Sequence, residues 1–203
     1  MEPIVVGICG GSASGKTSLC WKVQESLGVD CTVLEMDNFY RGLTPEQLPK
    51  VHEYNFDHPN ALDFDDIYEA LATLTKGHDA EIPVYDFKTH SRAPYKQTIK
   101  TNKLILYEGI YSLFDPRIRD MMKLKVFVHT DDDLRLCRRI KRDTAERGRS
   151  VDNVLDQYFK FVKPSYDEYI QPTMNYADII VPHGAYNKVA VDLIVLNLKN
   201  YLV

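Results

Sequence analysis

Short apolar runs alternate with amphipathic stretches along the chain. The runs that predict buried strands cover residues 4–9, 31–36, 103–107, 124–128 and 177–181. Apolar residues at helical spacing predict helices over residues 18–27, 63–76, 131–146, 151–162 and 189–202. We expect the fourth of these helices to end before Lys163-Pro164. Strands that alternate with helices are typical of an α/β fold, in which helices flank a parallel sheet.

Two further segments favour strands outside this alternation. Residues 81–87 and 95–101 are rich in β-prone side chains, and residues 89–94 connect them. Their prolines and charges suit exposed strands rather than the middle of a sheet. We therefore expect an appended β-hairpin over residues 81–101.

Composition limits the organisation and the partners of the protein. A chain of 203 residues, 44% of them hydrophobic, can bury one core, so we expect a single domain over residues 1–203. The net charge of −4 gives no general attraction to nucleic acid or to an anionic membrane. The first strand follows Met1 closely, and no apolar run reaches membrane-spanning length. These features predict a cytoplasmic protein that binds neither nucleic acid nor membrane.

The cysteines show no spacing typical of a metal site. The chain has four, Cys9, Cys20, Cys31 and Cys137, and no two of them form a C-x-x-C pair. We expect reduced residues that contribute to packing, neither zinc ligands nor disulfide partners.

The most informative stretch follows the first predicted strand and leads into the first predicted helix. It matches the pattern G-x-x-x-x-G-K-[ST] and consists of Gly10, Gly11, Ser12, Ala13, Ser14, Gly15, Lys16 and Thr17, followed by Ser18. The glycines let consecutive backbone N–H groups and the helix N-terminus point at a phosphate chain. Lys16 is then placed to bridge the outer phosphates, and the Thr17 hydroxyl to bind Mg²⁺. We predict a nucleoside triphosphate site here; the plainer alternative is a glycine-rich turn with a surface lysine.

Two predicted strands end in acidic residues. Asp37 follows residues 31–36, and Glu108 follows residues 103–107. The carboxyl ends of the strands of a parallel α/β sheet line its ligand crevice, so we expect both carboxylates beside the phosphate loop. Together with Thr17 they form the expected Mg²⁺ set. The alternatives are a turn-forming or capping role for Asp37 and a solvent-exposed strand end for Glu108.

The predicted helix over residues 131–146 carries acidic residues in its first turn, which complement the helix dipole. Its later turns carry four arginines that share one face: Arg135, Arg138, Arg139 and Arg142. Arg147 and Arg149 follow, with a glycine between them. Like charges at this spacing repel unless an anion or an acidic surface neutralises them. We expect a mobile lid over residues 142–152 that closes over a transferring phosphate; a solvated basic face is the alternative.

The remaining question is which class of phosphate chemistry the chain performs. A GTPase-type switch is disfavoured because residues 102–105, the nearest match to N-K-x-D, lack the aspartate. Residues 54–59 form part of a long irregular polar connection with two aromatic side chains and a carboxylate, which we interpret as part of a substrate pocket. A small-molecule kinase needs such a pocket, a base near it and a lid that excludes water, and the sequence offers all three.

Taken together, these motifs resemble the uridine kinase (uridine–cytidine kinase) family. The resemblance covers nearly the whole chain and is carried by residues 10–17, 37–41, 54–59, 83–92, 146–149, 157–158, 161–164 and 176–182. The phosphate loop is shared by many kinases, whereas residues 83–92 are specific to this family. The resemblance implies a P-loop NTPase-type fold. It also implies transfer of phosphate from ATP or GTP, with Mg²⁺, to the ribose 5′-hydroxyl of uridine or cytidine.

The resemblance also implies roles for individual residues. Asp37 resembles the general base toward the 5′-hydroxyl, and Asp57 and Arg139 look like the pair that holds the ribose 2′- and 3′-hydroxyls. The residues that read or wall the pyrimidine correspond to Tyr40, Phe56, Tyr85, Phe87 and His90. Lys16 and the lid arginines complete the expected catalytic set, which is Asp37, Lys16, Arg142, Arg147 and Arg149. The expected nucleoside contacts at the lid are Arg149 and Gln157.

Family members are typically homotetramers inhibited by CTP or UTP, and the resemblance implies the same here. One departure is Tyr111, which stands where the family usually carries an aliphatic residue. The nearest alternatives are kinases of the same group that act on nicotinamide riboside, pantothenate or ribulose 5-phosphate. A nucleotide-binding protein without phosphotransferase activity is the alternative from a different class.

Overall fold

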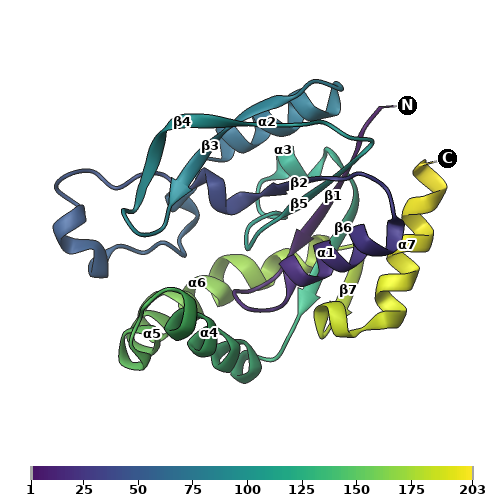
Figure 1. Ribbon diagram of the computed structural model, residues 1–203. Helices are drawn as coiled ribbons and strands as arrows, with labels where there is room; N and C mark the ends of the chain where they lie inside the picture. Colours follow the sequence, from purple (N-terminus) through teal and green to yellow (C-terminus); the bar gives the residue numbers. More distant parts are fainter. Residues whose placement is uncertain (1, 203) are drawn as a thin grey trace.

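Five parallel strands form the central sheet of the computed structural model, which describes residues 2–202 (Figure 1). The strands are β1 (Ile4–Cys9), β2 (Thr32–Glu35), β5 (Leu104–Glu108), β6 (Met122–His129) and β7 (Ile179–Pro182). Their order in the sheet is β2-β5-β1-β6-β7, so β1 lies in the middle. The predicted parallel sheet is therefore confirmed, with the phosphate-loop strand at its centre.

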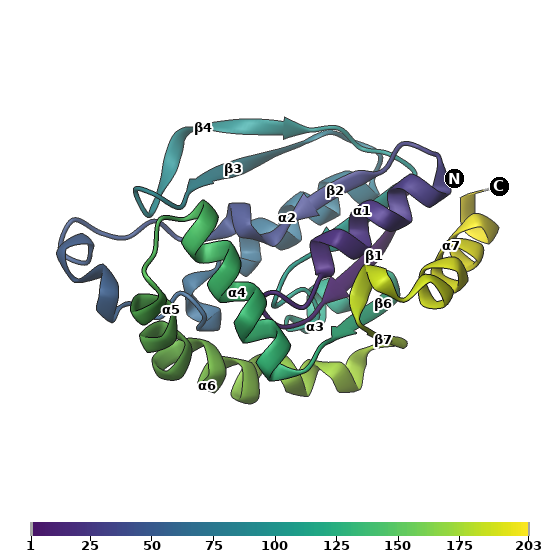
Figure 2. The same ribbon diagram turned by 60° about the horizontal axis from the view of Figure 1, so that its bottom comes forward.

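Helices cover both faces of this sheet. On one face α1 (Lys16–Leu27) and α7 (Lys188–Leu202) lie side by side (Figure 2). The other face packs against α2 (Phe64–Thr75), α3 (Pro116–Arg119) and the helical turns that precede β7. Because successive strand residues point to opposite faces, β5 sends Leu104 and Leu106 into one core and Ile105 and Tyr107 into the other. All four side chains are fully buried.

The predicted hairpin is a separate two-stranded antiparallel sheet. It consists of β3 (Ala80–Asp86) and β4 (Ser91–Ile99), with Asp86 opposite Ser91. β4 begins four residues earlier than the sequence pattern predicted. The reason is a tight turn over residues 87–90, in which His90 adopts a left-handed φ of 51°. The residues predicted to connect the strands therefore mostly belong to β4.

The helical region between β6 and β7 differs from the prediction. It comprises α4 (Asp132–Glu146), α5 (Val151–Gln157) and α6 (Lys163–Ser165), with wide π-helical turns over Tyr158–Val162 and Tyr166–Ile170. The expectation that a helix ends before Lys163-Pro164 is wrong. Proline lacks an N–H and clashes with the carbonyl four residues earlier in a regular α-helix. Here the Lys163 N–H reaches back five residues to the Tyr158 carbonyl, and this wider turn accommodates the proline.

The structure also corrects two smaller expectations. Helix α1 begins at Lys16, two residues before its predicted start, because Gly15 caps it with a left-handed φ of 99°. All four cysteines are free in the described chain, and Cys9 and Cys20 are buried. Cys31 is half-buried and Cys137 is exposed, so the expected packing role fails for Cys137. No helix within residues 2–202 is long and apolar enough to cross a bilayer.

We predict that Gly109→Ala destabilises the protein, because β2 and β5 approach closely just beyond their ends. A Cβ added at Gly109 would lie 2.3 Å from the Cβ of Met36. Overpacking of this kind costs about 1–3 kcal/mol of unfolding free energy, which urea denaturation measures. Gly42→Ala is the control, because its added Cβ would lie 3.3 Å from the nearest atom and should cost less. Equal stability of Gly109→Ala and the wild-type protein would contradict the prediction.

Candidate functional site

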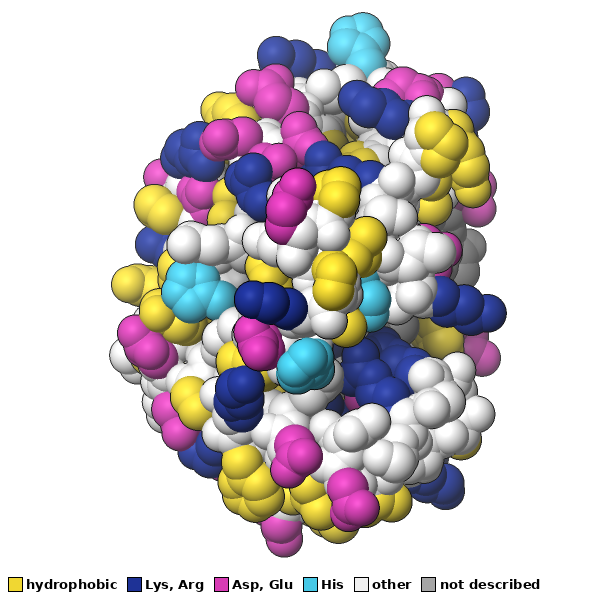
Figure 3. All heavy atoms as spheres, turned by 90° about the vertical axis from the view of Figure 1, so that its left-hand side faces the viewer, with side chains coloured by type: hydrophobic (Ala, Val, Ile, Leu, Met, Phe, Trp, Pro, Cys, Tyr) yellow, Lys and Arg dark blue, Asp and Glu magenta, His cyan; other side chains and the backbone are white. Residues whose placement is uncertain are grey.

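A cavity of ≈ 690 Å³ opens at the carboxyl edge of the parallel sheet. Figure 3 shows the hollow, with Lys and Arg side chains gathered inside it. Its walls come from the β1–α1 loop, the ends of β2 and β5, residues 54–57, the hairpin turn, α4, α5 and residues 183–186. The sheet topology therefore brings together segments that are far apart in the sequence.

The phosphate loop forms one wall of the cavity. Ser12, Ala13, Gly15, Lys16, Thr17 and Ser18 line it, whereas Gly10, Gly11 and Ser14 lie behind them. Ala13 adopts a left-handed φ of 61°, which keeps the loop in a tight curl. The Lys16 ammonium group is buried and donates to the Gly11 carbonyl oxygen at 3.1 Å. Lys16 is thus folded over its own loop, where a phosphate chain would meet it.

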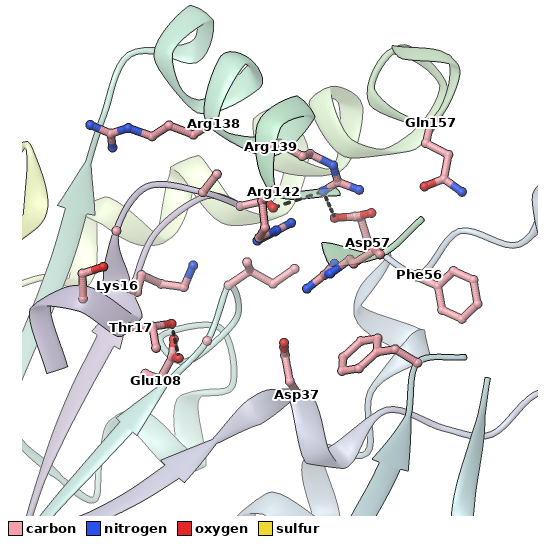
Figure 4. Close-up of a pocket in the computed structure, with 18 of the residues that line it drawn as sticks. Lys16, Thr17, Asp37, Phe56, Asp57, Glu108, Arg138, Arg139, Arg142 and Gln157 are labelled. Carbon is pink, nitrogen blue, oxygen red and sulfur yellow. Dashed lines mark hydrogen bonds and ion pairs between the residues drawn. The ribbon is translucent and has the colours of Figure 1, made fainter. Parts of the chain in front are cut away.

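Thr17, Glu108 and Asp37 lie at the floor of the cavity (Figure 4). The Thr17 hydroxyl donates to Glu108 Oε1 at 2.6 Å. Burial raises the pKa of the Glu108 carboxyl, and the charge of Lys16 opposes this rise. No cluster of three or more His, Cys, Asp or Glu side chains that could hold a metal occurs within residues 2–202. A hydroxyl and few carboxylates suit Mg²⁺, which keeps several waters and usually shares its ligands with substrate phosphates.

The opposite end of the cavity is aromatic. The rings of Phe56 and His90 stack with their centroids 4.9 Å apart, and Tyr40 and Phe87 complete the wall. Tyr54 also lines the cavity, in agreement with the interpretation of residues 54–59 as part of a substrate pocket, although it had no individual role assigned to it. Tyr85, expected to read the pyrimidine, is not among the residues that line the cavity. It packs against Tyr40 and Phe87 behind the wall, and its buried hydroxyl has no hydrogen-bond partner in the described chain.

Asp57 and Arg139 lie between the two ends (Figure 4). Arg139 Nη1 lies 4.0 Å from Asp57 Oδ1 and donates to the Ser12 hydroxyl at 3.1 Å, so it links the phosphate loop to residues 54–59. Burial raises the pKa of Asp57, and Arg139 and Arg149 oppose the rise. The buried Tyr111 donates its hydroxyl to the Asp57 backbone carbonyl. Tyr111 stands where the family usually carries an aliphatic residue, and this bond gives its hydroxyl a role in holding the backbone at Asp57.

Five arginines line the cavity: Arg138, Arg139, Arg142, Arg147 and Arg149. The predicted stripe on α4 is only partly correct, because Arg135 turns inward. Its guanidinium group lies 3.8 Å from the centre of the Tyr166 ring and pairs with Asp132. The sequence analysis predicted that an anion or an acidic surface must neutralise the remaining charges.

A fully buried carboxylate, Asp143, lies among these arginines. Burial acts to raise its pKa, but the charges of Arg142 and Arg139 outweigh this effect and hold the pKa below its ordinary value. Sequence reasoning did not identify Asp143. Its spacing of four residues from both Arg139 and Arg147 was the available signal.

The cavity also has a wall that sequence reasoning missed. His183, Ala185 and Tyr186 line it beside the phosphate loop. They follow the carboxyl end of β7, so the rule that placed Asp37 and Glu108 applies to them as well. Phe161 is a further unpredicted lining residue. Gln157 lines the cavity as expected, and its side-chain oxygen accepts a bond of 3.0 Å from Arg149.

Comparisons with known proteins agree with this geometry. The family model described as "Phosphoribulokinase / Uridine kinase family" matches residues 5–190. Uridine kinase-like protein 5 of Arabidopsis thaliana is 51% identical over 99% of the chain, which covers 43% of that relative. Uridine-cytidine kinase 2-B of Danio rerio is 45% identical over 99% of the chain and 81% of the relative.

Among solved structures, the phosphoribulokinase from Rhodobacter spheroides aligns with a TM-score of 0.65. The alignment covers 89% of this chain and 70% of the other at 18% identity. This likeness concerns the fold alone. The chain spans less than half the length of several curated relatives that it matches.

We predict that Glu108→Gln gains stability relative to the wild-type protein as the pH rises. Because the folded protein raises the pKa of Glu108, it holds this proton at a higher pH than the unfolded chain does. The wild-type protein therefore loses stability as the pH rises from the unfolded pKa of about 4.3 toward the raised folded value. Glutamine does not titrate and lacks this loss.

Urea denaturation between about pH 4 and pH 7 measures the difference in unfolding free energy between the two proteins. Glu146→Gln, at an exposed position, is the control for the change from a carboxyl group to an amide. A difference between Glu108→Gln and wild type that stays constant with pH would overturn the prediction.

Proposed function

Because the chain belongs to the phosphoribulokinase/uridine kinase family, we propose that it phosphorylates the 5′-hydroxyl of uridine and cytidine. ATP or GTP would be the donor, Mg²⁺ the metal, and UMP and CMP the products, in pyrimidine nucleotide salvage. The observation that carries this proposal is one continuous cavity. It joins a phosphate-binding loop at one end to stacked aromatic rings at the other.

The donor end of the cavity supports triphosphate binding. Backbone N–H groups of the phosphate loop and the N-terminus of α1 are suited to phosphate oxygens. Lys16 adds positive charge from the loop itself, and the cavity arginines add more from α4 and the segment after it. Thr17, Glu108 and Asp37 would hold Mg²⁺, which neutralises charge on the phosphates when bound. The exposed ring of Tyr186, 5.9 Å from the Arg138 guanidinium, offers a surface on which the donor base can stack.

The acceptor end supports a nucleoside. A planar pyrimidine fits against Phe56, His90, Phe87 and Tyr40, with Tyr85 supporting Tyr40 and Phe87 from behind. Burial, with the charge of Arg149, lowers the pKa of His90, which favours a neutral imidazole that can hydrogen-bond a base. The residues proposed to hold the ribose hydroxyls and the lid side of the nucleoside are Asp57, Arg139, Arg149 and Gln157.

Catalysis would depend mainly on alignment and charge. Phosphoryl transfer has a loose transition state, so the enzyme must hold the acceptor oxygen in line and stabilise charge on the transferring group. Asp37 lies between the aromatic wall and the phosphate loop, where it can orient the 5′-hydroxyl and accept its proton. The residues proposed to stabilise the transferring phosphoryl group are Lys16, Arg142, Arg147 and Arg149, with residues 142–152 acting as the lid.

The remaining expectations form part of the same proposal. We propose that residues 1–203 act as one kinase domain, with residues 81–101 as its substrate hairpin. The family resemblance extends the proposal to a cytoplasmic homotetramer that CTP and UTP inhibit.

The direct test is an ADP-release assay with ATP and Mg²⁺ and a panel of acceptors. We expect turnover with uridine and cytidine and about 5- to 150-fold lower kcat/KM with deoxyuridine. The missing 2′-hydroxyl leaves buried polar groups unpaired, at a cost of about 1–3 kcal/mol. Nicotinamide riboside is the contrasting acceptor. Turnover on it alone would refute the pyrimidine assignment, and a lack of turnover with every nucleoside would refute the kinase assignment.

We predict that Asp37→Asn lowers kcat by about 10²- to 10⁴-fold while ATP still binds. Asparagine keeps the size of the side chain but cannot accept the proton. Steady-state kinetics and calorimetric titration with ATP measure the two effects separately. Asp30→Asn, an exposed change just before β2, is the matched control. Near-normal turnover of Asp37→Asn would remove Asp37 from its proposed role.

A further inference from the structure

The buried carboxylate of Asp143 contacts four guanidinium groups, and none of the residue roles set out above uses it. Asp143 Oδ1 lies 2.8 Å from Arg142 Nε and 3.7 Å from Arg147 Nη1. Asp143 Oδ2 lies 3.1 Å from Arg149 Nη1 and 3.6 Å from Arg139 Nε. The side chain has no exposed surface, so the arginines and not water satisfy its charge.

The arginines keep donors free for the cavity. Arg142 binds Asp143 through Nε, and its buried Nη2 has no hydrogen-bond partner among residues 2–202. Arg139 approaches Asp143 through Nε and directs Nη1 to Ser12 and Asp57. The carboxylate therefore holds one edge of each of these guanidinium groups, while another edge faces the cavity that both residues line.

Asp143 also holds the backbone of the segment after α4. Its carbonyl oxygen accepts bonds from the N–H groups of Arg147, at 3.2 Å, and of Arg149, at 3.1 Å. Gly148, with a left-handed φ of 65°, lets the chain turn between them. Both the side chain and the main chain of Asp143 thus fix the positions of Arg147 and Arg149, just beyond the end of α4.

The charge balance favours a polyanion. The four guanidinium groups carry four positive charges, and the two carboxylates paired with them, Asp143 and Asp57, carry two negative charges, so an excess of two positive charges remains. That excess suits a polyphosphate, which carries several negative charges, whereas removing Asp143 would leave four like charges that repel. A single carboxylate thus restrains the arginines without cancelling their charge.

We propose that Asp143 is a positioning residue for phosphoryl transfer: it holds Arg142, Arg147 and Arg149 so that their remaining N–H groups meet the substrate phosphates, and it holds Arg139 beside the proposed ribose site. The inference rests on the proposed kinase function. Asp143 itself does not line the cavity, so it acts through the arginines. Transfer depends on their placement to within about 1 Å, because misplacement of that size can cost about 10²-fold in rate.

The test compares Asp143→Asn with Asp133→Asn, an exposed carboxylate on the same helix. Titration calorimetry with ATP gives the fraction of each protein that binds, and turnover with uridine is expressed per ATP site. A variant that merely folds poorly loses sites but keeps its turnover per site. We expect Asp143→Asn to lose about 10- to 100-fold of kcat per site and Asp133→Asn to match the wild-type protein. Wild-type turnover per site in Asp143→Asn would overturn the proposal.

A second readout does not need uridine turnover. Trypsin cleaves after Arg147 and Arg149, and we expect bound ATP to protect both sites in the wild-type protein and in Asp133→Asn. Protection of Asp143→Asn should be weaker by roughly threefold or more, measured by mass spectrometry. If the wild-type protein fails to phosphorylate uridine, the proposed function fails, and this protection still decides the role of Asp143. Equal protection in all three proteins would contradict that role.

Discussion

The parallel register of the central sheet is the constraint on which the rest of the site depends. Glu108 at the end of β5 is in register with Ile8 of β1 on one side and with Glu35 of β2 on the other. Backbone hydrogen bonds between the strands therefore place the phosphate loop, Asp37 and Glu108 close together at one edge of the sheet. The outermost strand β7, which pairs with β6, brings residues 183–186 to the same edge of the sheet. The order and register of the strands therefore place these segments side by side, independently of any contact between their side chains.

The second organising feature is that the buried charged groups of the site have partners within the protein. Lys16, Glu108, Arg139 and Asp143 are all largely buried, and each has at least one charged or hydrogen-bonding partner. A buried charge without a partner is costly, so these contacts keep the site folded before a substrate arrives. Some buried donors, such as Arg142 Nη2, have no hydrogen-bond partner among the described residues. They are suited to a negatively charged ligand. A bound phosphate would complete the balance.

The sequence predicted the parts of the site that follow from local pattern. The phosphate loop, Asp37 and Glu108 could be predicted because a short motif and the strand-end rule both refer to residues close in the chain. Arg135 could not be placed correctly, because residue type and spacing do not say whether a side chain turns toward the cavity or, as Arg135 does, inward against Tyr166. The bond from Tyr111 to Asp57 joins segments that are far apart in the sequence, so only the tertiary structure brings them together. The arginines around Asp143 are all within six residues of it, but their spacing does not say that the carboxylate is buried among them. The helix through Pro164 was missed because a proline ordinarily ends a helix, and π-helical turns leave no simple pattern.

We propose that this cavity aligns the 5′-hydroxyl of a pyrimidine riboside with a nucleoside triphosphate. The most direct measurement is ³¹P NMR of the protein incubated with ATP, Mg²⁺ and uridine. We expect ADP and one phosphomonoester to form in equal amounts, with the monoester signal coupled to the C5′ protons of the ribose. ADP accompanied only by inorganic phosphate, or a monoester coupled to the C2′ or C3′ proton, would contradict the proposed transfer to the 5′-hydroxyl.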